Sequence, residues 1–221
     1  TMKKRNDSLF WVGYSDLFTS LFFVILVLFV FAYVNQQRKV EELEKVLQVY
    51  KDVEKTIEPL KNDPTSFRYE EKYKRFVLGF DVKFKVNKAE ITENDLFNFE
   101  STKFKIIDAG NKLVKVLDKI ATDRSLDSNL KNVSYVVIIS GYASKLGSTK
   151  QNYDYELSYK RAYNLFDFWK NNKVNFEKNK YSDFVDLQIS GNGWGGIGRI
   201  MYNEEANQRF IIQIVPKVNN E

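Results

Sequence analysis

The sequence predicts an α+β protein with a single transmembrane helix near its N-terminus, a helical linker, and a domain in which a mixed sheet packs on helices. Residues 10–34 are almost all apolar, and residues 35–75 are rich in Glu, Lys, Val and Leu. Strand-like and helix-like patterns then alternate. We therefore divide the 221-residue chain into a short tail (1–9), the transmembrane helix (10–34), the linker (35–75) and a C-terminal domain (76–221).

The composition excludes several classes of chemistry. The chain has no cysteine and no histidine, which rules out a disulfide framework, Cys/His zinc sites and a Cys or His nucleophile or base. The net charge of +5 is spread over segments in which lysines alternate with acids and apolar residues, which indicates a solvated surface rather than a nucleic-acid interface. The sequence also has no P-loop. We expect no enzyme activity, no catalytic residue, no metal or organic cofactor and no direct contact with nucleic acid.

The apolar run is long enough to cross a lipid bilayer. About 20 helical residues span a hydrocarbon core about 30 Å thick, and residues 17–34 are nearly all Leu, Phe, Val and Ile. A secretory signal peptide would have a shorter apolar region and a small-residue cleavage site, which residues 31–40 lack. Bases cluster just before the run, at residues 3–5. The positive-inside rule therefore favours a cytoplasmic N-terminus and a C-terminal domain outside the inner membrane.

Asp16 is the one acidic residue inside this run. A carboxylate at membrane depth is costly unless it is paired, hydrated or protonated. Thr19 and Ser20 follow at i+3 and i+4 and share its helix face. One interpretation is that Asp16 marks the membrane interface. The other is that Asp16, Thr19 and Ser20 face partner helices and that Asp16 carries an ion, with H⁺ favoured and Na⁺ as the alternative.

Residues 10–30, FWVGYSDLFTSLFFVILVLFV, resemble the transmembrane helix of MotB-type stator subunits, in which an aromatic residue, Tyr-small-Asp, Thr and a long aliphatic run follow one another. The resemblance implies that Asp16 binds and releases the driving ion. It also implies two copies of this chain inside a ring of five MotA-like or ZorA-like subunits. Two relatives remain open, flagellar MotB and ZorB of the Zorya anti-phage system; the short tail, residues 1–9, slightly favours ZorB.

The sequence of the linker predicts an amphipathic helix or a short parallel coiled coil. Its apolar residues follow three–four spacing: Val40, Leu43, Leu47, Tyr50 and Ile57. Pro59 and Pro64 are expected to end the helix. A solvated spacer is the alternative interpretation. In MotB-like proteins this stretch includes a plug that blocks ion flow, and the resemblance leaves that role open here.

The C-terminal domain is expected to follow the order β-α-β-α-β-β, a sheet layered against helices. Strands are predicted in residues 76–86 (one or two), 133–143, 184–193 and 207–216, and helices in 99–121 and 156–172. In the first helix the inward-facing residues are expected to be Phe104, Ile107, Leu113, Val116, Leu117 and Ile120. In the second they are Leu157, Ala162, Leu165, Phe166 and Trp169.

Much of this domain, roughly residues 76–216, resembles the OmpA-like peptidoglycan-binding domain. The matching residues are Gly141, Tyr142, Gly147, Leu157, Ser158, Arg161, Ala162, Asn207 and Arg209. The resemblance implies a peptidoglycan site at Tyr142, Ser144, Asp154, Leu157, Arg161 and Arg209. Its strongest candidate is Arg161, because an arginine near a helix start can fork onto a stem-peptide carboxylate with two hydrogen bonds. A surface arginine in an i,i+4 ion pair is the alternative.

The sequence departs from the family pattern at two positions. The family's loop aspartate, which is expected to hold the ammonium group of diaminopimelate, is Ser144 here, and Asp154 stands where the family usually has asparagine. Neutralisation of a bound ammonium is therefore weaker unless Asp154 substitutes, and Ser144 adds to the preference for ZorB. Together the motifs predict an ion-driven stator subunit anchored to peptidoglycan. A flagellar stator and an OmpA-like tether without ion transport are the alternatives.

Overall fold

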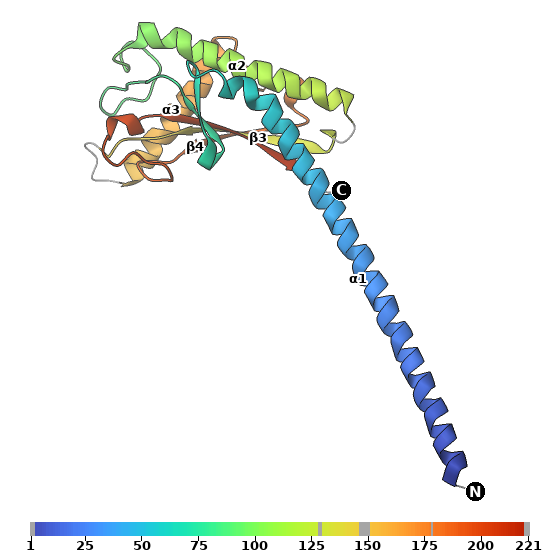
Figure 1. Ribbon diagram of the computed structural model, residues 1–221. Helices are drawn as coiled ribbons and strands as arrows, with labels where there is room; N and C mark the ends of the chain where they lie inside the picture. Colours follow the sequence, from blue (N-terminus) through green and yellow to red (C-terminus); the bar gives the residue numbers. More distant parts are fainter. Residues whose placement is uncertain (1–2, 128–129, 146–150, 178, 219–221) are drawn as a thin grey trace. The chain divides into compact units, whose positions relative to one another are not determined.

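The computed structural model describes residues 3–127, 130–145, 151–177 and 179–218, without the side chains of residues 3–9, 151, 152 and 179 (Figure 1). Its helices and strands are α1 (Lys3–Lys61), β1 (Phe67–Glu70), β2 (Arg75–Leu78), α2 (Phe99–Leu126), β3 (Val133–Gly141), α3 (Gln151–Asn171), β4 (Val185–Gly191) and β5 (Phe210–Val218), with 3-10 turns η1 (Glu71–Tyr73), η3 (Asn179–Tyr181) and η4 (Glu205–Asn207). The predicted α+β class is confirmed. The chain divides into two compact units, one up to Gln48 and one from Val49 onward.

The first unit is the N-terminal part of α1, which is long and apolar enough to span a membrane. Every side chain from Phe10 to Val34 is exposed in the chain by itself. Aromatic rings contact one another along the helix, as Tyr14 and Phe18 do with ring centroids 4.6 Å apart. Since water is a poor solvent for this much apolar surface, lipid or partner helices must cover it.

The last turns of α1 belong to the second unit. Val49, Val53, Ile57 and Leu60 are buried and join its hydrophobic core. The helix runs through Pro59 to Lys61, so the expectation that Pro59 ends it is wrong. A proline so near the C-terminal end removes a single backbone hydrogen bond and leaves the rest of the helix intact. Residues 49–61, which the sequence placed in the linker, therefore pack with the C-terminal domain.

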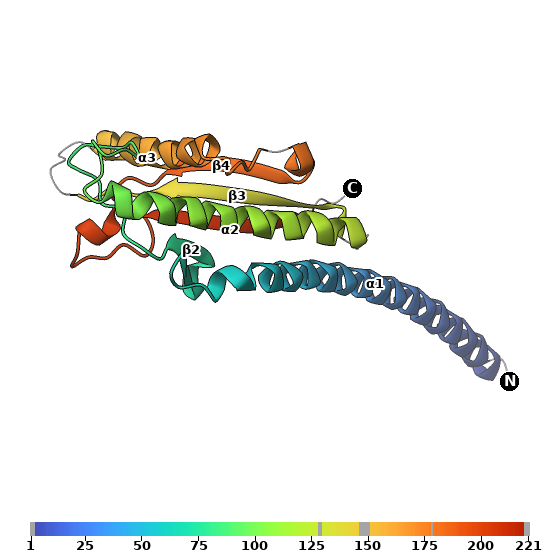
Figure 2. The same cartoon turned by 90° about the horizontal axis from the view of Figure 1, so that it is seen from above.

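The second unit is built on a five-stranded mixed sheet in the order β1-β2-β5-β3-β4 (Figure 2). The β3–β4 pair is parallel and the other pairs are antiparallel. β3 and β4 are joined through α3, so these three elements form a βαβ unit in which the parallel strands need a long crossover. In their register, Gly141 lies opposite Gly191 at the carboxyl ends of both strands.

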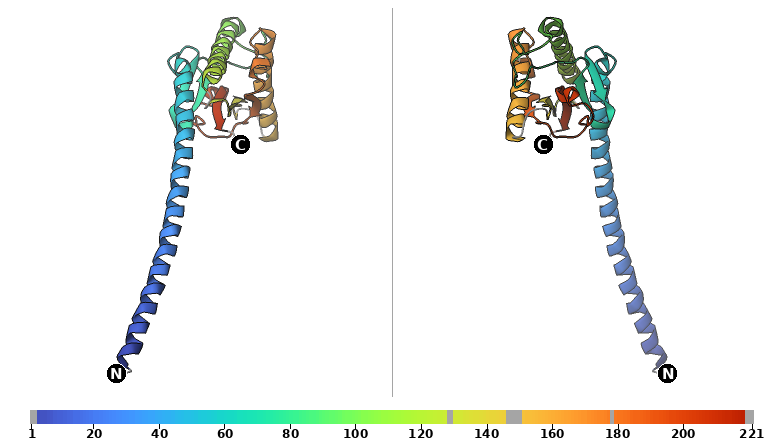
Figure 3. Two further views of the ribbon diagram at one scale, coloured as in Figure 1. Left: turned by 90° about the vertical axis from the view of Figure 1, so that its right-hand side faces the viewer. Right: turned by 90° about the vertical axis from the view of Figure 1, so that its left-hand side faces the viewer.

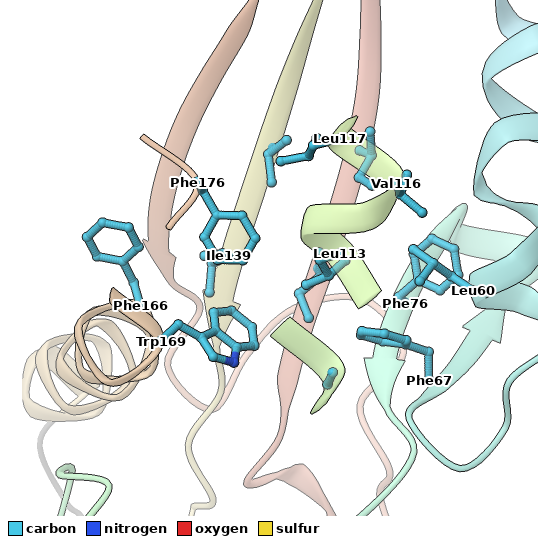
Figure 4. Close-up of a cluster of buried hydrophobic side chains, with 14 of the residues drawn as sticks. Leu60, Phe67, Phe76, Leu113, Val116, Leu117, Ile139, Phe166, Trp169 and Phe176 are labelled. Atoms are coloured by element: carbon cyan, nitrogen blue, oxygen red, sulfur yellow. The ribbon is translucent and has the colours of Figure 1, made fainter. Parts of the chain in front are cut away.

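Helices α2 and α3 pack along the sheet around one core (Figures 3 and 4). Trp169 of α3 is fully buried, and its Nε1 donates a hydrogen bond to the Ile106 carbonyl of α2 at 2.6 Å. A Cβ on Gly110 would lie 2.5 Å from that same Nε1. The two helices can therefore approach this closely only because residue 110 has no side chain.

The predicted inward faces of these helices hold with one exception. All five residues predicted for α3 are buried, and so are Leu113, Val116, Leu117 and Ile120 of α2, while Ile107 packs partly buried against the core. Phe104 is 67% exposed, which contradicts the sequence expectation. The buried stripe of α2 passes instead through Thr102 and Ile106. Phe104 lies off this stripe because it is two residues away from both, about 200° around a helix that turns once in 3.6 residues.

The expected strand over residues 76–86 is present only as β2, which ends at Leu78. A Cβ on Gly79 would lie 2.4 Å from the Pro64 carbonyl, so the residue after β2 packs directly against the backbone that precedes β1. Farther on, Val82 and Phe84 are buried, but the pairing of this segment is a single bridge between Phe84 and Leu96. The alternation of apolar residues in this segment therefore reflects burial of every second side chain, and not the continuous hydrogen bonding of a β-strand. β1, which the sequence did not predict, pairs with β2 instead.

The core position of Leu113 predicts a large loss of stability on truncation. Leu113→Ala should lower the free energy of unfolding by about 2 to 5 kcal/mol, because it removes buried methyl groups and leaves a cavity. Phe104→Ala, on the exposed side of the same helix, should change it by less than about 0.5 kcal/mol. Denaturant unfolding of the two variants checks both values, and equal losses would contradict the assigned orientation of α2.

Candidate functional site

A pocket of about 470 Å³ lies between the segment after β2, the first turns of α3 and the segment around η4. Ser144, Asp154, Leu157 and Arg161 line it, so the structure brings together four of the six residues that the sequence assigned to a peptidoglycan site. The remaining wall is formed by Asp81, Val82, Lys83, Phe84, Lys85, Val86, Asn87, Phe97, Asn203, Glu205, Ala206 and Gln208.

Arg161 is a buried cation at this pocket. The residue is 3% exposed. Its Nε donates a hydrogen bond to the Lys88 carbonyl at 3.0 Å, and its Nη1 donates one to the Tyr142 carbonyl at 3.5 Å. The guanidinium lies over the Phe84 ring, 4.3 Å from its centroid. Burial lowers the pKa of Arg161 to about 10, so the group remains charged at neutral pH. It is not the surface arginine of the alternative interpretation, since within the described residues no carboxylate forms an ion pair with it.

Asp154 is a buried acidic residue that lines the same pocket from the first turn of α3. The residue is 2% exposed, and its Oδ2 atom is buried without a hydrogen-bond partner. Over the described part of the chain, Asp154 and Arg161 form no ion pair with each other. Buried polar groups are nearly always hydrogen-bonded, so an unpartnered carboxylate oxygen beside a pocket points to a partner that arrives with a ligand.

The other two residues give the pocket a neutral side. Ser144 is part-buried, and its Oγ accepts a hydrogen bond from Gln208 Nε2 at 3.2 Å. Leu157 is 9% exposed and contributes apolar surface between the two charges along α3. Position 144 is therefore neutral, and its hydroxyl oxygen already accepts a hydrogen bond from the protein.

Two glycines at the strand ends position α3 against the sheet. A Cβ on Gly141 would lie 2.1 Å from the Ser158 carbonyl, and one on Gly191 would lie 2.5 Å from the Tyr159 amide nitrogen. Ser158 itself is fully buried, and its Oγ accepts a hydrogen bond from the Gly193 amide at 2.8 Å. This contact explains the Gly141 and Ser158 positions of the sequence motif. Gly147, the other loop glycine of that motif, lies outside the described residues.

Arg209 and Tyr142 lie outside the pocket, in a network around Glu70. Glu70 accepts a hydrogen bond from Arg75 Nε at 2.7 Å through Oε2 and from Arg209 Nη1 at 3.2 Å through Oε1. Arg75 also donates to the Tyr142 hydroxyl at 3.3 Å and to the Ile197 carbonyl at 2.9 Å. The network therefore ties β1 and β2 to the residue after β3, the residue before β5 and the loop after β4. Arg209 lines a second pocket of about 110 Å³.

Arg75 is a residue of this network that the sequence did not single out. Arg75 is 6% exposed. Burial lowers the pKa of the neighbouring Arg209, and the negative charge of Glu70 partly offsets this lowering. The partner carbonyl of Arg75 at Ile197 is 122 residues away in the chain. No local spacing in the sequence could have signalled that contact.

The predicted ion-carrying residues lie together on α1. Asp16, Thr19 and Ser20 are all exposed in the chain by itself. Thr19 Oγ1 donates to the Ser15 carbonyl at 2.8 Å, so its hydroxyl bonds to the helix backbone rather than to Asp16. Among the residues that the structure describes, no side chain pairs with the Asp16 carboxylate, and no cluster of three or more acidic ligands could hold a metal ion.

No protein-family model and no curated protein sequence matches the chain. Solved structures that resemble it include the OmpA-like domain of FopA1 from Francisella tularensis, with 21% identity, coverage of 70% of this chain and 82% of that one, and a TM-score of 0.36. The C-terminal domain of Helicobacter pylori MotB has 18% identity, coverage of 63% and 86%, and a TM-score of 0.32. A putative MotB-like protein from Desulfovibrio vulgaris has 9% identity, coverage of 79% and 91%, and a TM-score of 0.39. With likenesses this distant, the roles of the site residues rest on this chain's own geometry.

The Glu70 network predicts a marked cost for removing its carboxylate. Glu70→Gln leaves two nearly buried guanidinium groups without a counter-charge, and the free energy of unfolding should fall by about 3 kcal/mol. Glu71→Gln is the matched control, because the Glu71 side chain is 66% exposed and its close partner is Lys74, which is 63% exposed. An exposed ion pair of this kind contributes about 0 to 1 kcal/mol. Denaturant unfolding compares the two. Equal effects would contradict the structural role of the network.

Proposed function

We propose that this chain is the peptidoglycan-anchored B subunit of an ion-driven, MotAB-like rotary motor in the bacterial inner membrane. The observation that carries the proposal is the combination of two features in one chain. One is Asp16, a single carboxylate in an apolar helix long enough to span the membrane. The other is a pocket with the buried guanidinium of Arg161. Such a chain joins a membrane to a fixed external polymer, which is what a stator requires.

Asp16 supplies the motor end of the proposal. No other part of the described chain covers the helix surface around Asp16, and a carboxylate facing lipid alone would be strongly unfavourable. Partner helices can cover it and give it a path for H⁺ or, alternatively, Na⁺. We propose two copies of the chain inside a ring of five MotA-like or ZorA-like subunits, in which loading and unloading of Asp16 moves the ring.

Arg161 supplies the wall end. Peptidoglycan stem peptides carry free carboxylates, and a guanidinium binds a carboxylate with paired, charge-assisted hydrogen bonds. Two backbone carbonyls occupy Nε and Nη1 of Arg161, and an arginine has five N–H donors in all. Donors therefore remain for a ligand in the pocket. In this arrangement the N-terminus is cytoplasmic and the C-terminal domain lies in the periplasm.

Within this class we favour the ZorB component of a Zorya anti-phage system over a flagellar MotB, on the strength of the neutral residue Ser144 in the pocket. The genes beside this one discriminate between them: a helicase-like defence gene supports ZorB, and flagellar genes support MotB. The alternative function is a peptidoglycan tether that transports no ion. Substitution of Asp16 distinguishes the motor from the tether.

Asp16→Asn should abolish ion-driven function, because the amide cannot bind and release a proton at neutral pH. The partner subunits should still co-purify with the variant, since the side-chain shape is almost unchanged. The measurement is ion flux in proteoliposomes that contain the complex, with Glu41→Gln, outside the apolar run, as the matched control. Unchanged flux in the Asp16→Asn complex would favour the tether.

Arg161→Ala should weaken binding to purified peptidoglycan about tenfold or more, the loss expected for a charge-assisted hydrogen bond. Lys160→Ala is the matched control, because Lys160 is the neighbouring cation on α3 but is 59% exposed and pairs with Glu156. Co-sedimentation of the full chain in detergent measures both, with circular dichroism to show that each variant is folded. Equal pelleting of Arg161→Ala and the parent would remove Arg161 from the site.

A further inference from the structure

We propose that the second, smaller pocket binds a carboxylate group, which Arg68 and Arg209 hold. The ligand class is a monoanionic carboxylate of about the size of acetate, either a free ion or the end of a peptide. Arg161 is not among the described residues that line this pocket. The site is therefore separate from the one in the proposed function and does not depend on it.

The pocket lies on the face of the sheet opposite the main core. Side chains alternate between the two faces along a strand. Phe67 of β1 packs into the main core, so its neighbour Arg68 projects from the other face, where it lies opposite Val77 of β2. Val77 belongs to a separate apolar cluster with Tyr142 and Ile211. Arg68 and Val77 both line the pocket, which places the site on this second face.

Arg209 brings a buried donor to the pocket wall. The residue is 8% exposed. Its Nη1 donates a hydrogen bond to Glu70, and its Nη2 donates one to the Gly198 carbonyl. Its Nε is buried, and no atom of the described residues accepts a hydrogen bond from it. Buried N–H groups are nearly always hydrogen-bonded, so this Nε indicates an acceptor that a ligand supplies.

The charges around this pocket leave one positive charge in excess. Three guanidinium groups lie there, on Arg68, Arg75 and Arg209. The two carboxylates are those of Glu70, which the two buried arginines share, and of Asp81 on the pocket wall. Within the described part of the chain, neither Arg68 nor Asp81 forms an ion pair. A monoanion neutralises the excess charge, whereas a dianion such as phosphate would leave a negative excess.

The size and lining of the pocket favour a carboxylate that is attached to a small apolar group. A guanidinium binds a carboxylate with paired, charge-assisted hydrogen bonds. The pocket volume is about 110 Å³, well below the roughly 300 to 1,000 Å³ of pockets that enclose whole drug-sized ligands. Val77, Leu78 and Phe210 also line it, and these side chains suit the carbon atom that carries the carboxylate.

The test is urea unfolding of the full chain in detergent at pH 7, in sodium acetate or in sodium chloride of equal ionic strength. A ligand that binds only the folded state raises the unfolding midpoint as its concentration rises. The parent midpoint should rise more in acetate than in chloride. Arg68→Gln should need about tenfold more acetate for the same rise, which is the loss expected for a charge-assisted hydrogen bond.

Lys72→Gln is the matched control. Lys72 is an exposed cation on η1, and it does not appear among the described residues of the pocket wall. Acetate also stabilises proteins generally through its exclusion from their surface, and that part of the rise is common to all variants. Lys72→Gln should therefore respond to acetate as the parent does. Circular dichroism shows that both variants are folded.

A second arm replaces acetate with N-acetylglycine, which models the C-terminal carboxylate of a peptide. A larger rise with N-acetylglycine assigns the site to a peptide end, and a larger rise with acetate assigns it to a free ion. Equal rises in the parent and Arg68→Gln would overturn the inference. Arg68→Gln should pellet with peptidoglycan as the parent does, and weaker pelleting would show that this pocket belongs to the wall-binding site instead.

Discussion

The close contact between α3 and the ends of β3 and β4 is the constraint on which the candidate site depends. Gly141 and Gly191 lie opposite each other in the parallel pair, and a side chain on either would collide with the backbone of α3. The helix can therefore lie directly on the strand ends. That placement turns one side of its first three turns, with Asp154 and Arg161, toward the pocket and turns Trp169 into the core.

The two ends of the chain share an energetic principle. At each end, a side chain that can carry charge forms no ion pair within the described residues. Asp16 lies in an apolar helix, and Arg161 lies in a desolvated pocket with neutral acceptors. Stability alone would select against such groups, and this is why they support the proposed roles in binding an ion and a ligand. The two proposed functional residues are therefore ones that lack a charged partner in the isolated chain.

Sequence patterns predicted the parts of the structure that local periodicity controls. The α+β class, the inward face of α3 and the gathering of Asp154, Leu157 and Arg161 near one site all follow from helical spacing and a contiguous motif. Features that depend on contacts between residues far apart in the chain could not be predicted in this way. Arg209 and Tyr142 were assigned to the pocket, but Arg75 and Glu70, from the distant β1–β2 hairpin, draw them into a separate network.

The continuation of α1 into the core bears on how the C-terminal domain can be obtained alone. Val49, Val53, Ile57 and Leu60 fill part of the same hydrophobic cluster as the sheet and its helices. A soluble fragment cut at the apparent domain start near residue 76 would lack these four side chains and the edge strand β1. The core surface that these side chains cover would be exposed to water in such a fragment and would favour aggregation. A fragment that begins before Val49, beyond the lipid-facing residues, retains the whole folding unit.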